Sequence, residues 1–337
     1  MEVNSTAIPV TESSQAGHAR RTASALAARL GFNEEAQGKV ALVVSEAAKN
    51  LVAHAREGQI LLRALDGGSL VGLEMLAVDK GPGMADVDRC MRDGYTTAGT
   101  GGVGLGAMRR QSSLFDIHSL PGMGTVVLAQ FWPGAPPPPS GLEVGVVCVP
   151  KPGEEVCGDS WRVDRKDGRF FVLVADGLGH GPDAARASRA AVVSLVEQGP
   201  REVVEMLRGM DPELRSTRGA AVSIALLDGA KVHYSGVGNI SGAVVTPGGI
   251  QRMVSMNGTL GHQTHRMQQF DYAWSPESTL VMCSDGLSTQ WRVDPYPGLL
   301  ARHPSVVAGV LYRDFARGRD DMTVLVAREV PAGRSPR

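Results

Sequence analysis

The sequence predicts an α+β protein of two domains, a two-layer domain followed by a helix-flanked β-sandwich. The chain has 337 residues, about twice the ~150 residues of an ordinary domain. The stretch WPGAPPPPSG at 132–141 interrupts it once and is typical of a stiff inter-domain spacer, with a ligand for proline-binding modules as the less favoured alternative. Helices precede strands in the first half, whereas many short strands dominate the second.

The first half begins with two helical patterns. HARRTASALAARLG at 18–31 is rich in Ala, Leu and Arg and ends at a glycine, as helices commonly do. The run at 34–55 repeats apolar residues at three- and four-residue steps, which predicts a longer helix. Four apolar runs then predict strands at 59–65, 70–78, 114–120 and 124–131. Helices on one face of a mostly antiparallel sheet give two layers.

The second half alternates short apolar runs with turn residues. Strands are expected at 145–150, 170–176, 221–228, 231–238, 242–247, 279–285 and 322–329. Helices are expected at 186–199, 201–210 and 305–317. Many strands with a few helices between them predict a β-sandwich flanked by helices.

Composition excludes several classes of protein. Lys and Arg number 34 against 35 Asp and Glu, so no electrostatic case exists for nucleic acid or an anionic membrane as a partner. The four cysteines are scattered without a C-x-x-C pair, which argues against a zinc site or disulfide framework. The N-terminus is polar, and no apolar run approaches the ~20 residues of a membrane span. We therefore expect a cytoplasmic protein.

Acidic residues recur where the strands of the second half begin or end. Asp159 stands in CGDSW, Asp176 and Asp285 each close a strand and precede a glycine, and Asp320 and Asp321 stand directly before the last strand. Asp-Gly is a common hairpin turn. A hairpin needs a second strand at once, however, and loop sequence follows both pairs. We therefore expect these acids at the mouths of buried strands, facing a shared space.

Carboxylates gathered at one end of a sandwich repel one another, and divalent cations would remove that repulsion. Their hard oxygen atoms suit Mg²⁺ or Mn²⁺. Two such ions ~4 Å apart activate a shared water and hold a phosphoryl group for in-line attack. The glycine after Asp176, Gly177, would let its own carbonyl approach a metal.

The motifs GDSW, VLVADGLGHGPDAARAS, VMCSDGL and GRDDMTVLVA occur in that order, and their succession resembles the PP2C-type serine/threonine phosphatases, in particular the bacterial SpoIIE and RsbX branch. The resemblance covers 141–330 and implies an α-β-β-α sandwich that binds two Mn²⁺ or Mg²⁺ ions. It implies catalytic and metal-binding roles for these residues: Asp159, Asp176, Gly177, Asp285 and Asp320, with Asp321 as the second choice for the last ligand.

Two further points concern phosphate and proton handling. The eukaryotic branch of the family has a phosphate-binding arginine near its start, and none can be placed here, so phosphate capture is assigned mainly to the metals. His180, in a Gly-His-Gly loop, could donate a proton to the leaving oxygen. A loop histidine held by backbone hydrogen bonds is the favoured interpretation.

The first half contains GTGGVG at 99–104, which fits a dinucleotide-binding turn only after a strand. A polar segment precedes it, so a Rossmann fold is not favoured. SEAAKN at 45–50, DKGPGM at 79–84 and PGMGT at 121–125 occur around it. Their order resembles the GHKL (Bergerat-type) ATPase fold, closest to the RsbT and RsbW serine kinases, over 14–132.

The resemblance gives these residues roles that fit their chemistry. Glu46 and Asn50 are four apart, hence on one helix face; Asn50 would bind the Mg²⁺ of ATP and Glu46 would act as the kinase base. Asp79 would accept a hydrogen bond from adenine. The other residues assigned to nucleotide binding are Gly81, Gly83, Gly102, Gly104, Gly106 and Thr125, the glycines near 104 offering N–H groups to phosphates.

The sequence therefore predicts a bacterial switch protein with domains at 14–132 and 141–330 joined by a linker at 133–140. The phosphatase would act on a phosphorylated STAS-type anti-sigma-factor antagonist, with a sigma factor or stressosome-like complex as further partners. The first domain would bind ATP-Mg²⁺ and phosphorylate or sequester a partner. The alternatives are a nucleotide- or protein-binding module without phosphotransfer, and purely structural metals in the second domain.

Overall fold

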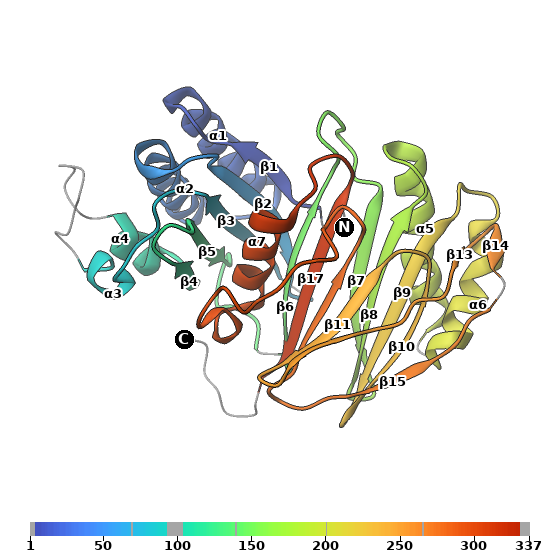
Figure 1. Ribbon diagram of the computed structural model, residues 1–337. Helices are drawn as coiled ribbons and strands as arrows, with labels where there is room; N and C mark the ends of the chain where they lie inside the picture. The colour runs from blue at the N-terminus through green and yellow to red at the C-terminus, as the bar shows by residue number, and fades with distance from the viewer. Residues whose placement is uncertain are drawn as a thin grey trace. The chain divides into compact units, whose positions relative to one another are not determined.

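The computed structural model describes residues 4–68, 70–92, 104–138, 140–199, 201–264 and 266–330. These residues form two compact units (Figure 1). The described residues within 1–139 and 293–313 pack into the first unit. Those within 140–292 and 314–332 pack into the second. The segment 293–313 thus belongs to the first unit although the chain on both sides of it belongs to the second.

The first unit is built on one antiparallel sheet in the order β1-β2-β3-β5-β4. Its strands are β1 Thr6–Pro9, β2 Gln59–Asp66, β3 Val71–Asp79, β4 Leu114–Ser119 and β5 Thr125–Phe131. Its helices before the linker are α1 Ser13–Arg29, α2 Glu34–His54, α3 Val87–Cys90 and α4 Gly104–Gln111. Asn33 caps α2 by accepting a hydrogen bond from the Ala36 amide at 2.9 Å.

One face of this sheet packs against the helices. Alternate strand residues such as Ile60 and Met75 lie in one core with Val40 and Val44 of α2 and with small residues of α1 such as Ala23. Alternation of side chains across a strand sends the intervening residues to the opposite face. The prediction that helices form a layer on one face of an antiparallel sheet is confirmed.

The opposite face of the sheet is covered by the segment 293–313, which contains a 3-10 turn at Leu299–Ala301 and most of α7, Pro304–Phe315. A Cβ on Gly309 would lie 2.8 Å from Val126 of β5, so α7 approaches the sheet closely. Helix α7 has buried residues around its whole circumference, which is typical of a helix enclosed in protein rather than one on a surface.

The second unit contains two five-stranded sheets, in the orders β15-β10-β9-β8-β7 and β12-β11-β16-β17-β6, and a two-stranded ribbon. The strands of the first sheet are β7 Asp159–Lys166, β8 Arg169–Gly177, β9 Ala220–Asp228, β10 Lys231–Val237 and β15 Phe270–Ala273. Those of the second are β6 Leu142–Val149, β11 Ser241–Thr246, β12 Gly249–Arg252, β16 Thr279–Cys283 and β17 Met322–Glu329. The ribbon pairs β13 Gly258–Thr259 with β14 Gln263–Thr264.

The two sheets enclose an apolar core that includes Val172, Tyr234, Met282 and Leu325. Helices α5 Pro182–Gln198 and α6 Val203–Leu214 cover the outer face of the sheet that contains β8 and β9 (Figure 1). The predicted α+β class and the helix-flanked sandwich are confirmed. No helix among the described residues is both long and apolar enough to span a bilayer.

Candidate active site and nucleotide site

The sandwich brings the predicted acids to neighbouring strand ends. Asp159 opens β7 and Asp176 lies near the end of β8, and the two residues are direct partners across the β7–β8 ladder. Asp285 follows β16, and Asp320 and Asp321 precede β17, in the facing sheet. All four other acids act electrostatically on Asp176. The structure therefore places the five carboxylates around one region of the second unit.

Hydrogen bonds hold some of these carboxylates and leave others unsatisfied. Ser284 Oγ donates to Asp159 Oδ2 at 2.7 Å, and Asn239 Nδ2 donates to Asp285 Oδ2 at 2.8 Å. The Lys151 amide donates to Asp321 Oδ1 at 2.9 Å. In the described part of the chain, the buried atoms Asp159 Oδ1 and Asp321 Oδ2 have no hydrogen-bond partner, which is rare for buried polar atoms.

Burial and mutual repulsion shift the acids toward their protonated forms. Burial raises the pKa of Asp159 to about 7, with further repulsion from Asp321 and Asp285. Burial also raises the pKa of Asp176 to about 9, followed by repulsion from Asp159 and the other acids. The pKa values of Asp285 and Asp321 are raised as well, again mainly by burial. A site with this much uncompensated negative charge favours bound cations.

We expect the metal-free protein to lose stability as the pH rises from about 4 toward 9. The folded state keeps protons on Asp159 and Asp176 that an unfolded chain releases near pH 4, so the unfolded state binds fewer protons and the free energy of unfolding falls with pH. Each excess proton corresponds to about 1.4 kcal/mol per pH unit, or about 3 kcal/mol between pH 5 and 7. Thermal unfolding of metal-free wild type and of metal-free Asp176→Asn across pH 5–8 measures this loss of stability.

The comparison with Asp176→Asn cancels the contribution of the remaining titratable groups. The melting temperature of the variant should change less steeply with pH than that of wild type. Added Mn²⁺ should raise the wild-type melting temperature more at pH 8 than at pH 5.5, because the metal binds deprotonated carboxylates. A wild-type profile that is parallel to that of the variant would contradict the assignment.

The residues fit a divalent metal without forming a closed cage. No group of three or more His, Cys, Asp or Glu in the described ranges converges tightly enough to hold an ion alone. Mg²⁺ usually binds protein through one or two carboxylates and retains several waters. The unsatisfied oxygen of Asp159 and the repulsion among the acids therefore suit hydrated ions.

Gly177 has a steric reason to be glycine. A Cβ there would collide with the carbonyl oxygen of Ala184 in α5, and the Gly177 amide donates to the Gly158 carbonyl at 3.2 Å. The loop after it leads directly into α5 and not into a hairpin strand, as predicted from the sequence. His180 in this loop is held by a side chain instead of the expected backbone bonds, since its Nδ1 lies 2.7 Å from Glu154 Oε1.

The first unit brings Glu46 and Asn50 together with the start of α4. A Cβ on Gly104 would lie 3.7 Å from the Asn50 amide and 3.9 Å from Glu46 Oε2. The two side chains therefore share one face of α2 beside the N-terminus of α4, as the four-residue spacing predicts. Lys49 Nζ forms an ion pair with Glu46 Oε1 at 2.7 Å. Gly106 is buried within α4, whereas Gly102 lies outside the described residues.

Asp79 is placed at the end of β3 beside Thr125, its partner across the β3–β5 ladder. Its Oδ1 accepts a hydrogen bond from the Gly81 amide at 2.6 Å. Burial raises the pKa of Asp79, partly opposed by the bond from Gly81 and by the charge of Arg313. Gly83 has φ +67°, and a Cβ there would collide with the Leu120 carbonyl. The Gly81 amide thus holds the Asp79 carboxylate, and Gly83 allows the loop after Asp79 to pass close to Leu120.

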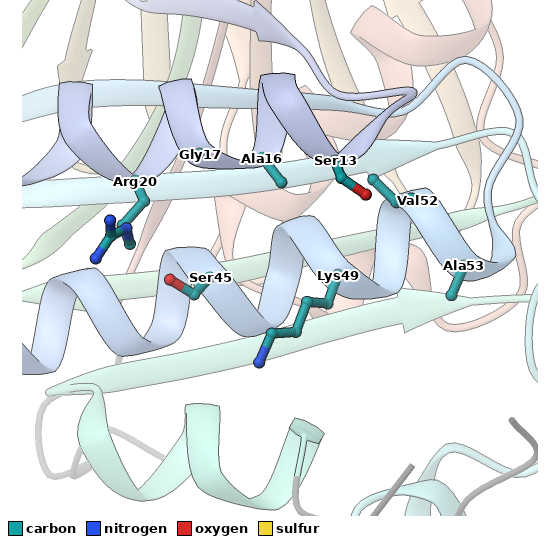
Figure 2. A pocket seen from close by; sticks show the side chains of 8 residues that line it. All are labelled: Ser13, Ala16, Gly17, Arg20, Ser45, Lys49, Val52 and Ala53. Atoms are coloured by element: carbon teal, nitrogen blue, oxygen red, sulfur yellow. The ribbon is translucent and has the colours of Figure 1, made fainter. Parts of the chain in front are cut away.

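A separate groove of about 410 Å³ runs between α1 and α2 (Figure 2). Its lining residues are Ser13, Ala16, Gly17, Arg20, Ser45, Lys49, Val52 and Ala53. None of the predicted nucleotide-binding residues lines this groove. Its Lys49 nevertheless forms the ion pair with Glu46, so the groove borders the helix face that carries Glu46 and Asn50.

Sequence reasoning missed the residues that hold these acids in place. Asn239 and Ser284 bond Asp285 and Asp159, and Ser119 Oγ accepts from the Met84 amide at 2.8 Å and lies 2.9 Å from Thr125 Oγ1. Ser284 is adjacent to Asp285 in the motif VMCSDGL, which was an available signal. Asn239 lies in GVGNISG, outside the motifs named above, and had no such signal.

Comparisons with known proteins find relatives for each of the two units. Residues 9–131 match the family described as "Histidine kinase-like ATPase domain", and residues 166–329 match "Stage II sporulation protein E (SpoIIE)". The "Serine/threonine-protein kinase RsbT" of Bacillus subtilis is 34% identical over 114 residues, covering 34% of this chain and 86% of that protein. The "Phosphoserine phosphatase RsbX" of the same organism is 29% identical over 142 residues, covering 41% of this chain and 71% of that protein.

A solved structure described as "The bacterial stressosome: a modular system that has been adapted to control secondary messenger signaling" is 30% identical, with a TM-score of 0.52. It covers 56% of this chain and 99% of that chain. The fold and acidic site define a PP2C-type protein serine/threonine phosphatase joined to a GHKL-type ATPase fold. More particularly, the chain belongs to the histidine kinase-like ATPase family, with RsbT as a relative, and to the SpoIIE family, with RsbX as a relative.

Proposed function

We propose that the second unit removes phosphate from phosphoserine or phosphothreonine on a STAS-type anti-sigma-factor antagonist in the bacterial cytoplasm. The observation that carries this proposal is the meeting of five carboxylates from both sheets of the sandwich. Asp159, Asp176, the Gly177 carbonyl, Asp285 and Asp320 would hold two Mn²⁺ or Mg²⁺ ions. When bound, such ions supply an activated water and neutralise the phosphoryl oxygens.

The protein's own groups orient this site. Ser284 donates to Oδ2 of Asp159, and Asn239 donates to Oδ2 of Asp285. The Oδ1 atom of each carboxylate does not take part in these two bonds and would be the atom that binds a cation. Asp159 is 1% exposed, so its position is fixed by packing. Preorganised carboxylates of this kind require little rearrangement when they bind a cation.

Asp320 and Asp321 would have different roles. Asp321 is 3% exposed and accepts the Lys151 amide, so it holds the loop before β7, whereas Asp320 is partly exposed and repels Asp285. Asp320→Ala should raise the Mn²⁺ concentration for half-maximal turnover at least tenfold with little change in melting temperature. Asp321→Ala should lower the melting temperature by about 4–8 °C, for a loss of about 2 kcal/mol. The reverse pattern would assign the ligand to Asp321.

We further propose that the first unit binds ATP-Mg²⁺ and phosphorylates a protein of the same partner-switching pathway. Asp79 would recognise adenine, Asn50 would bind Mg²⁺, and Glu46 would accept the proton of the attacking serine. Support comes from the juxtaposition of Glu46 and Asn50 with Gly104 and from the relative named as a serine/threonine kinase.

A binding module without phosphotransfer is the alternative for the first unit. The ion pair between Lys49 and Glu46 favours it, because the lysine occupies the carboxylate that would otherwise accept a substrate hydroxyl. The alternative predicts nucleotide binding, and regulation of the phosphatase, without a phosphorylated product.

Two assays of the 337-residue chain test both activities. Incubation with a phosphorylated STAS protein and Mn²⁺ should release phosphate, and incubation with the unphosphorylated protein and ATP-Mg²⁺ should produce phosphoserine or phosphothreonine. Glu46→Ala should remove the second reaction and retain the first. Absence of phosphorylation by wild type would leave the binding module as the function of the first unit. A phosphorylation rate that is unchanged in Glu46→Ala would exclude Glu46 as the base.

A further inference from the structure

The segment 293–313 joins the two proposed sites along the chain. It lies between β16 and β17 of the phosphatase sheet, and therefore between the proposed metal ligands Asp285 and Asp320. It nevertheless packs in the nucleotide-binding unit. A short loop within the second unit could connect β16 to β17. The packing of the connecting segment in the first unit therefore requires a physical reason.

The face of the nucleotide-binding sheet that receives this segment is matched to it by polar contacts. Tyr312 OH donates to Gln59 Oε1 at 2.7 Å. The His303 amide donates to Asp116 Oδ2 at 2.6 Å. His118 Nε2 lies 3.3 Å from the Pro297 carbonyl. Contacts along the whole segment show that it is part of this unit and not a loop that touches it at one point.

At the centre of this face lies a buried charged network. Arg63, Glu74 and Gln130 occupy neighbouring positions on β2, β3 and β5, and they are 5%, 1% and 8% exposed. Glu74 Oε1 accepts from Arg63 at 2.7 Å, and Oε2 accepts from Gln130 at 2.8 Å and from Ser305 Oγ at 2.7 Å. A buried carboxylate is costly unless its oxygens are bonded, so Ser305 of α7 completes the network.

The last residues of α7 make contacts in the first unit, and the residues that follow make contacts in the second. Arg313 Nη1 lies 3.5 Å from the carbonyl oxygen of Asp79, the proposed adenine-binding residue. The next residues enter the phosphatase unit, where the Phe315 carbonyl accepts from the Ser288 amide at 2.9 Å. The Arg317 amide donates to the Gly286 carbonyl at 2.9 Å. Gly286 directly follows Asp285.

We propose that α7 is a shared element through which nucleotide binding at Asp79 and metal binding at Asp285 and Asp320 change each other's affinity. This inference rests on the proposed function of both units. A displacement of the Asp79 loop would act on Arg313 and hence on α7, a helix buried along its length. The residues that follow α7 are hydrogen-bonded to Gly286, the neighbour of Asp285, so the same displacement would alter the proposed metal ligand Asp285.

Coupling of this kind is reciprocal and typically changes affinity between 5- and 150-fold. The test measures Mn²⁺ binding to the full-length chain by calorimetry, with and without saturating ADP in excess Mg²⁺. In wild type we expect ADP to change the Mn²⁺ dissociation constant at least fivefold. The control is Asp79→Asn at an ADP concentration that saturates wild type but leaves this weaker-binding variant largely free. Any change in its Mn²⁺ affinity then reports metal chelation by the nucleotide.

Arg313→Gln should reduce the effect of ADP on the Mn²⁺ dissociation constant to less than twofold. The matched control is Arg215→Gln, because Arg215 is an exposed arginine paired with Asp211 on α6 and should retain the wild-type coupling. Circular dichroism establishes that each variant is folded. Equal loss of coupling in both variants, or unchanged coupling in Arg313→Gln, would overturn the role of α7.

Hydrogen–deuterium exchange on wild type tests the same idea without a substitution. ADP should slow amide exchange in 304–317 and in 284–288 as well as around Asp79. An ADP-bound chain in which only the Asp79 region changes, or in which Mn²⁺ affinity is unaltered, would refute the coupling and leave the proposed function intact. A chain that binds no ADP at all would refute both the coupling and the nucleotide-binding function.

Discussion

Asp176→Asn is expected to lower phosphatase turnover by at least about 10³-fold at saturating Mn²⁺. The substitution removes one negative charge from a cluster that would balance two divalent cations. It also replaces a carboxylate oxygen by an amide group that binds Mg²⁺ and Mn²⁺ less strongly. A 10³-fold loss corresponds to about 4 kcal/mol of transition-state stabilisation. Turnover of an aryl phosphate by the full-length chain measures this effect with no need for the natural substrate.

The same variant should be more stable than wild type when no metal is bound. Burial and four neighbouring acids oppose ionisation of Asp176, so metal-free wild type must take up a proton at Asp176 when it folds near neutral pH. An uncharged asparagine avoids this cost. Lower activity with a higher metal-free melting temperature is the pattern of a functional site whose charges are held together at a cost in stability.

Asp164→Asn is the matched control, since Asp164 lies on β7 in the same sheet and forms a surface ion pair with Arg162 at 2.8 Å. Exposed ion pairs contribute at most about 1 kcal/mol, so turnover and metal dependence should stay close to wild type. Equal activity of Asp176→Asn and wild type would exclude the metal-dependent phosphatase mechanism for this site.

The parts of the fold that could be predicted are those with strong local patterns. The long helix with Glu46 and Asn50 and the apolar strands β8 and β16 form where periodicity and turn residues predict them. Strands β1, β7, β12 and β15 were not predicted, and each lies at a sheet edge. Edge strands are half-exposed and short or polar, so their sequences lack a clear apolar alternation.

The position of α7 could not be predicted for a different reason. The apolar run at 305–317 predicts a helix, but local periodicity does not specify which sheet the helix covers. The relevant signal was in the first unit, where Arg63 and Glu74 interrupt otherwise apolar strands. Charged residues in the middle of such strands indicate a buried polar network with a partner, yet the partner Ser305 is 231 positions away from Glu74. Distant pairings of this kind require the structure.

The second large effect concerns the nucleotide site, where Asp79→Asn should weaken ADP binding at least about 50-fold. Asp79 is partly buried, and its Oδ1 is already bonded to the Gly81 amide, so its second oxygen is the acceptor proposed for the adenine amino group. An asparagine that keeps the Gly81 bond presents an NH₂ group there, and two donors then face each other in a desolvated site. A loss of about 2.3 kcal/mol, equivalent to 50-fold, is typical of an unsatisfied buried polar group.

Asp66→Asn provides a closely matched control for this measurement. Asp66 Oδ1 accepts from the Gly68 amide at 2.9 Å, the same two-residue turn that Asp79 forms with Gly81, but Asp66 is exposed at the end of β2. Its substitution should change neither ADP affinity nor melting temperature appreciably. Calorimetric titration of ADP-Mg²⁺ into both variants compares them directly. Binding to Asp79→Asn that is as tight as binding to Asp66→Asn would show that Asp79 does not contact the base, and the nucleotide would then have to be recognised elsewhere in the first unit.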